Sequence, residues 1–176
     1  MKHCDSSRRS LLSLPVLALA VAGARAAAAS ADAGDAASGR AVPPSFEAGT
    51  FAKIVSAGAG RPLVVHFWGL TCAPCIEELP RWGTFVRREP GLNVAFIQVD
   101  PMPPDRVAAI LRRAGLERAR NWTARAPVDE RWRYRIDPDW AGELPRTLLI
   151  AATGRRIASS GRVDFEHLRS WLGRDR

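Results

Sequence analysis

Runs of apolar residues predict an α/β domain that begins near residue 45. Short stretches rich in β-branched and aromatic residues predict three buried strands, over residues 63–68, 93–99 and 142–150. Between the first two strands, apolar residues recur at helical spacing over residues 72–89, with Pro80 bending the helix. A strand, a helix and a second strand in this order predict a right-handed crossover and parallel pairing of the two strands.

The rest of the pattern extends this domain toward the C-terminus. Apolar positions predict another helix that ends near Gly115. A turn at residues 151–155 predicts a hairpin with an antiparallel strand over 156–160. Asp164 is a good N-cap for a last helix with an apolar stripe of Phe165, Leu168, Trp171 and Leu172.

Two segments have a weaker pattern. Residues 45–55 are interpreted as a short amphipathic helix with Ser45 as its N-cap. Residues 117–140 are rich in arginine and tryptophan and have little periodicity, apart from a short helix expected at 129–134. We interpret this segment as a surface insertion whose tryptophans cover the edge of the core, and a rim that contacts a partner protein is the alternative.

The N-terminus has the pattern of an export signal. Arg8 and Arg9 precede an apolar run over residues 11–22, and Ala24–Ala26 offers a small-x-small cleavage site. The paired arginines resemble a twin-arginine signal. The run is shorter than the roughly 20 residues of a membrane-spanning helix, which favours a cleaved signal over an anchor. We therefore expect a signal over residues 1–26, a flexible linker over 27–44 and a domain over 45–176 that lies in the periplasm.

Composition and charge limit the classes of function that the chain could have. The 176 residues are 25% charged and 47% hydrophobic, which is typical of a globular protein. Of the formal net charge of +8, the expected signal over residues 1–26 carries +3 and the rest of the chain +5. The excess on the rest of the chain comes from dispersed arginines, so we expect a solvated basic surface and no nucleic-acid partner. A general attraction to acidic partners stays open.

The cysteines indicate redox chemistry. Cys4 lies in the segment expected to be removed, which leaves Cys72 and Cys75. Two cysteines are too few for a disulfide framework or for a closed zinc site, so no metal is expected. Ile76 stands where a haem-attachment motif has histidine. Cys72 falls at the expected start of a helix, where free N–H groups and the helix dipole stabilise a thiolate.

Three motifs carry a resemblance to a known family. Phe67–Trp68 precedes Cys72-Ala73-Pro74-Cys75, Glu78-Leu79-Pro80 follows it, and Leu144-Pro145-Arg146-Thr147 opens the third strand. Over residues 45–172 the chain resembles the exported TlpA-like disulfide reductases of the thioredoxin superfamily. The resemblance implies a thioredoxin-like α/β fold: a central mixed sheet flanked by helices, with an N-terminal extension and an insertion before the strand that begins at a cis-proline.

The resemblance also implies roles for individual residues. Cys72 is expected to attack substrate disulfides and Cys75 to resolve the mixed disulfide. Glu78 matches an acid that tunes the pKa of the cysteines and carries protons. Pro145 matches the cis-proline that faces the two cysteines. The expected substrate contacts are Trp68, Ala73, Pro74 and Leu144.

His66 is a departure from the family pattern. Six residues before the first cysteine, thioredoxins have a buried aspartate and TlpA-like members often have an asparagine. A neutral histidine there could relay a proton to or from Cys75 and so tune the pKa of the cysteine pair. The alternative is a core histidine whose hydrogen bonds are satisfied within the fold.

The expected function is that of an exported thiol–disulfide oxidoreductase. The resemblance implies a monomer that reduces disulfides of specific periplasmic proteins, in cytochrome c maturation, copper-site assembly or sulfur metabolism. It implies no cofactor other than the Cys72–Cys75 disulfide, and electrons supplied by a membrane thiol-reducing protein. A periplasmic disulfide oxidant or isomerase is the alternative, followed by a copper-binding metallochaperone that uses the two thiols.

Overall fold

The computed structural model describes residues 42–174. The predicted export signal, Cys4 and most of the predicted linker lie outside the described residues. The predicted domain can be followed from its first residues to the last helix.

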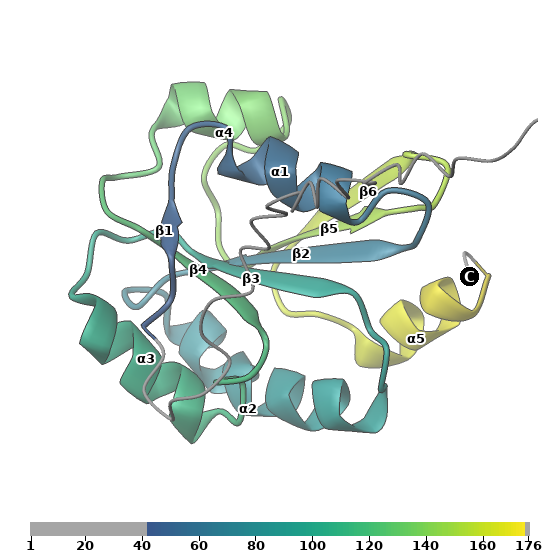
Figure 1. Ribbon diagram of the computed structural model, residues 1–176, viewed down its shortest axis with the longest axis horizontal. Helices are drawn as coiled ribbons and strands as arrows, with labels where there is room; N and C mark the ends of the chain where they lie inside the picture. Colours follow the sequence, from purple (N-terminus) through teal and green to yellow (C-terminus); the bar gives the residue numbers. More distant parts are fainter. Residues whose placement is uncertain (1–41, 175–176) are drawn as a thin grey trace, which may run out of the picture. The chain divides into compact units, whose positions relative to one another are not determined.

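One mixed sheet organises residues 42–174, as the resemblance implies. Its strands lie in the order β1-β4-β3-β2-β5-β6 (Figure 1). The four strands β1, β4, β3 and β2 pair in parallel, and β5 and β6 join them as an antiparallel hairpin. The bounds are β1 Ser45–Phe46, β2 Leu63–Trp68, β3 Val94–Gln98, β4 Arg120–Ala124, β5 Arg146–Ile150 and β6 Arg156–Ser160.

Helices cover both faces of this sheet (Figure 1). One face carries α2, α3 and α5, and the other carries α1 and α4. The bounds are α1 Thr50–Ala57, α2 Ala73–Arg88, α3 Pro104–Arg113, α4 Glu130–Ile136 and α5 Phe165–Arg174. Asp164 accepts hydrogen bonds from the backbone N–H groups of Glu166 and His167, which confirms it as the cap of the last helix.

Strand β2 lies at the centre and separates two apolar cores. All six of its residues are buried. Val64 and Trp68 pack against α2, α3 and α5, whereas Leu63, Val65 and Phe67 pack on the face of α1 and α4. This alternation follows from the two-residue period of a strand. His66 points to the same face as Val64 and Trp68, and so lies under α2.

Helices α2 and α3 approach each other closely. A Cβ atom at Gly83 would lie 1.8 Å from the carbonyl oxygen of Ala114, which caps α3. Only a residue without a side chain fits at this crossing. The contact fixes α3 beside the helix that begins at Cys72.

The structure corrects the two segments with weak patterns. Residues 45 and 46 form a short edge strand instead of the start of a helix, and α1 begins only at Thr50, after Gly49 at a φ of 90°. Arg120–Ala124 is strand β4 of the sheet, so the interpretation of 117–140 as a surface insertion is wrong for these residues.

The remainder of the Trp/Arg-rich segment agrees better with the prediction. The short helix expected at 129–134 is α4, and Asp129 caps it. Trp140 is buried and Trp132 packs beside it on the core between the sheet, α1 and α4. These two tryptophans therefore cover the core, as the interpretation expected. None of the helices within residues 42–174 is both long enough and apolar enough to span a bilayer.

Candidate active site

The two cysteines lie at the junction of β2 and α2. Cys72 is the N-cap of α2, and its sulfur accepts a hydrogen bond from the backbone N–H of Cys75 at 3.2 Å. Pro74 occupies the first turn, where a residue without an N–H costs nothing. A sulfur in this position receives the field of the helix N-terminus, which favours its thiolate form.

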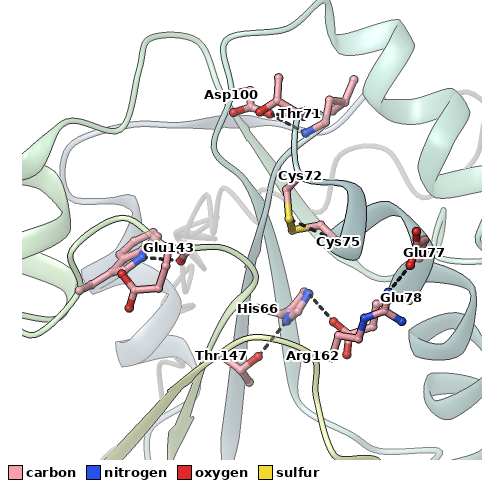
Figure 2. Close-up of a disulfide and its surroundings, with 12 residues drawn as sticks. His66, Thr71, Cys72, Cys75, Glu77, Glu78, Asp100, Glu143, Thr147 and Arg162 are labelled. Carbon is pink, nitrogen blue, oxygen red and sulfur yellow. Dashed lines mark hydrogen bonds and ion pairs between the residues drawn. A yellow bond between two sulfur atoms is a disulfide. The ribbon is translucent and has the colours of Figure 1, made fainter.

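Cys72 and Cys75 form a disulfide (Figure 2). The two cysteines differ in exposure. Their sulfurs are 2.11 Å apart and their Cα atoms 5.3 Å apart. Cys72 is half-buried, whereas Cys75 is fully buried in the core beneath α2. Cys72 is therefore the cysteine that is partly accessible to another protein, and Cys75 is not accessible.

The loop before Cys72 is held by Asp100, which follows β3. One carboxylate oxygen of Asp100 accepts hydrogen bonds from the backbone N–H groups of Leu70 at 2.5 Å and Thr71 at 3.2 Å (Figure 2). A Cβ atom at Gly69 would lie 2.7 Å from that oxygen and 3.1 Å from a methyl carbon of Leu144. A side chain at residue 69 would push against Asp100 and Leu144, so glycine suits the chain where it passes between them.

The peptide bond between Leu144 and Pro145 is cis, as the resemblance implies. Leu144 is half-buried beside Gly69, and Pro145 is buried. The chain next to this bond is fixed by Arg146, whose buried guanidinium bonds to Asp137, to Glu143 and to Ser160. This network holds the Leu144–Pro145 bend beside the loop that carries the disulfide.

Two buried ionisable side chains lie behind the disulfide. His66 and Glu78 have fully buried side chains, with 4.0 Å between His66 Nε2 and Glu78 Oε2 (Figure 2). The Nδ1 atom of His66 lies 2.9 Å from the hydroxyl of Thr147, which β5 places opposite it in the sheet. Glu78 Oε1 accepts a hydrogen bond from the backbone N–H of Val163 at 2.5 Å. The two atoms that face each other, Nε2 and Oε2, have no hydrogen-bond partner within residues 42–174.

Burial shifts the pKa of each group in the direction that favours its uncharged form. It lowers the pKa of His66 from 6.5 to about 3, because the ring lies among apolar groups that include Trp82 and Phe96. Burial also raises the pKa of Glu78, against the smaller opposing effects of the Val163 N–H, Arg81 and Arg162. Near neutral pH the ring is therefore uncharged, and the carboxyl of Glu78 holds a proton more readily than a carboxyl in water.

The expected substrate contacts divide into two groups. Ala73 is exposed, and Pro74 and Leu144 are half-buried around Cys72. Trp68 is 1% exposed and belongs to the core beneath α2, so its burial argues against the direct substrate contact expected for it. It supports the end of β2 from which the loop to Cys72 begins.

Sequence reasoning assigned no site role to three residues that the structure brings to this region. Asp100 orders the loop before Cys72, Thr147 bonds to His66, and Val163 bonds to Glu78. Thr147 belongs to the Leu-Pro-Arg-Thr motif, which was its only signal in the sequence. Among residues 42–174 there is no cluster of three or more histidine, cysteine or acidic residues that could hold a metal ion.

Comparison with solved structures identifies the fold. DsbF from Mycobacterium tuberculosis superposes with a TM-score of 0.57 at 14% identity, over 69% of this chain and 85% of that one. The fold is thioredoxin-like. A secreted M. tuberculosis disulfide oxidoreductase homologous to Escherichia coli DsbE gives 0.55 at 17% identity, over 68% and 85% of the two chains.

A third thioredoxin-like structure agrees with the first two. It is a thiol:disulfide interchange protein of the thioredoxin family from Chlorobium tepidum, with a TM-score of 0.54 at 17% identity over 68% of this chain and 83% of that one. No protein-family model and no curated protein matches the chain. At these identities the likeness establishes the fold, and the chemistry has to be argued from the residues themselves.

The lowered pKa of His66 makes stability depend on pH. Between pH 6.5 and about 3 the unfolded chain binds a proton at His66 and the folded chain does not. Acidification through this range therefore favours unfolding, by up to ~1.4 kcal/mol per pH unit. We expect His66→Asn to remove this part of the slope when the unfolding free energy of the oxidised protein is measured in urea across the range.

The exposed His167 provides the matched control. His167→Asn is expected to keep the slope of the unchanged protein. A difference between His66→Asn and the unchanged protein that stays constant from pH 6.5 to 3 would contradict the assignment of a neutral, buried His66.

Proposed function

We propose that this protein is a thiol–disulfide oxidoreductase that reduces disulfides of other proteins. The observation that carries the proposal is the half-exposed Cys72 at the N-terminus of α2, bonded to the fully buried Cys75. This asymmetry gives the two sulfurs different tasks. Similarity to thioredoxin-like oxidoreductases agrees with this chemistry.

The reaction is a pair of thiol–disulfide exchanges. In the dithiol form, the Cys72 thiolate attacks a substrate disulfide, forms a bond to one substrate sulfur and releases the other as a thiolate, which takes up a proton. The Cys75 sulfur then loses its proton and attacks Cys72. This step forms the Cys72–Cys75 disulfide and releases the second substrate thiol. Two electrons and two protons have passed to the substrate.

Glu78 and His66 are proposed to serve the second exchange. Cys75 is buried, so its proton needs an acceptor that is also buried. The carboxyl of Glu78, whose pKa burial raises, can take that proton and return it. His66 is uncharged at neutral pH and lies 4.0 Å from Glu78, where it adds no positive charge that would hold the carboxyl ionised. A neutral His66 would thus leave the pKa of Glu78 raised, so that the carboxyl can bind the proton.

The cellular setting follows from the N-terminal sequence pattern and the family resemblance. Residues 1–26 have the pattern of an export signal, which supports a periplasmic location. A reductant in that oxidising compartment needs a membrane thiol-reducing protein to restore its dithiol. The substrates would be proteins of cytochrome c maturation, copper-site assembly or sulfur metabolism. We expect the protein to act as a monomer. Its substrates would contact the surface around Ala73, Pro74 and Leu144.

The division of labour between the cysteines can be tested by trapping. Cys75→Ser removes the resolving sulfur, so the mixed disulfide on Cys72 should persist with a protein disulfide substrate such as insulin. Cys72→Ser should form no adduct, because the remaining sulfur is buried. Non-reducing gel electrophoresis and mass spectrometry of the adducts measure both results. Adducts of equal yield with the two variants would contradict the proposed roles.

The role of Glu78 can be tested against its neighbour. Glu78→Gln keeps an acceptor for the Val163 N–H but cannot bind a proton, so it should slow resolution of the mixed disulfide about ten-fold or more near neutral pH. Stopped-flow measurement of substrate thiol release across pH reports the effect. Glu77→Gln is the control, since Glu77 is exposed and pairs with Arg162 at the surface. Equal rates and pH profiles in the two variants would show that Glu78 carries no proton.

A further inference from the structure

A surface groove opens beside the disulfide, between α2 and α3. It has a volume of about 640 Å³ and begins at Thr71, the residue before Cys72. Its apolar lining comes from both helices and from the loops that precede them: Leu70, Ile76, Leu79, Met102, Ile110 and Ala114. The groove lies on the side of α2 that faces α3, whereas the Leu144–Pro145 bend contacts the loop at Gly69.

Two arginines of α3 line the same groove. Arg106 and Arg113 are two helical turns apart, ~10 Å along the axis, and both are exposed. Neither guanidinium has an ion pair or a hydrogen bond within residues 42–174. The groove therefore has an apolar floor and two positive charges that the described part of the chain leaves unpaired.

The acidic residues near the groove lie at its end or outside its lining. Among residues 42–174, no aspartate or glutamate lines the groove. Asp100 lies at its Leu70–Thr71 end, but its carboxylate accepts hydrogen bonds from the two backbone N–H groups there. Asp105 is exposed in the first turn of α3 and is absent from the lining. The described lining of the groove thus carries two positive charges and no negative one.

We propose that this groove binds an acidic, amphipathic segment of the substrate protein, beside the cysteine that Cys72 attacks. An apolar side chain of that segment would cover the floor, and carboxylates would pair with Arg106 and Arg113. The inference rests on the proposed function and adds the chemistry of the preferred substrate. A second copy of this chain matches the groove less well, because the chain is itself basic, with a net charge of +8.

The groove has a consequence for exchange rates. A carboxylate held by the arginines brings the neighbouring substrate sulfur toward Cys72, so both the rate of encounter and the lifetime of the complex rise. Two solvent-exposed ion pairs together change a rate constant by about five-fold at low salt. The gain must fall as salt screens the charges.

The test compares two peptides that differ only in charge. Each has a leucine next to a single cysteine that carries a 2-pyridyl disulfide, followed by two glutamates in one peptide and two glutamines in the other. The rate of pyridine-2-thione release by the reduced full-length protein is measured at low and high salt. We expect the glutamate peptide to react about five-fold faster at low salt and the difference to shrink at high salt.

Variants of the arginines then test whether the preference for the glutamate peptide arises in the groove. Arg106→Gln with Arg113→Gln should bring the two peptides to nearly equal rates while leaving the rate of the glutamine peptide unchanged, which also reports an intact active site. Arg112→Gln is the matched control, because Arg112 is exposed on the same helix but outside the groove. Reversal to Arg106→Glu with Arg113→Glu should favour a third peptide that carries two lysines.

The outcomes separate this inference from the proposed function. A glutamate preference that survives Arg106→Gln with Arg113→Gln, or that Arg112→Gln removes equally, overturns the groove as the binding site. Equal rates for both peptides with the unchanged protein overturn it as well. If instead these variants alter the sedimentation of the free protein from dimer to monomer, the groove is a self-association face and the inference is wrong. Failure of the proposed function differs from all of these, since neither peptide would then react faster with the protein than with glutathione.

Discussion

The burial of Cys75 beneath an accessible Cys72 is the constraint on which the site depends. It follows from the first turn of α2, which places one sulfur at the helix N-terminus and the other against the central strand β2. Gly69 and Asp100 fix the loop that leads into this turn, and the Leu144–Pro145 bend packs beside it. Because the surrounding backbone is held from two sides, the proposed substrate would meet Cys72 in one geometry, and the sulfur of Cys75 would approach from the protein interior.

The burial of Cys75 raises the question of where its proton goes. The core residues Glu78 and His66 offer an answer. A buried sulfur that must lose a proton to react, and regain it when the disulfide is reduced, needs a buried partner of suitable pKa. Glu78 has a raised pKa and is anchored by Val163, while the neutral His66 is held by Thr147. Removal of two polar side chains from water costs stability unless each is paired, and here each has one hydrogen bond and one unpaired atom. Such incomplete pairing is typical of groups kept for chemistry.

The sequence was sufficient for the parts of the fold with strong apolar patterns. The buried run of β2, the helix after Cys72 and the hairpin of β5 and β6 could all be predicted because their periodicity and turn residues are local. Strand β4 was missed because it is polar: Asn121 bonds to the carbonyls of Leu116 and Ala119, and Thr123 bonds to Gln98. The partners of His66 and Glu78 lie 81 and 85 residues away in the chain, so only sheet register and helix packing could reveal them. Likewise, the groove lies between α2 and α3, whose close approach at Gly83 no local pattern reveals.

The reduction potential of the Cys72–Cys75 pair tests the central claim most directly. It can be measured by equilibrating the full-length protein with a series of thiol–disulfide buffers and quantifying the free thiols. A protein disulfide reductase should have a potential near that of thioredoxin, ~−270 mV, so that electrons flow from it to substrate disulfides. A value near ~−120 mV, at which the pair would instead donate its disulfide to other proteins, would contradict the assignment as a reductase.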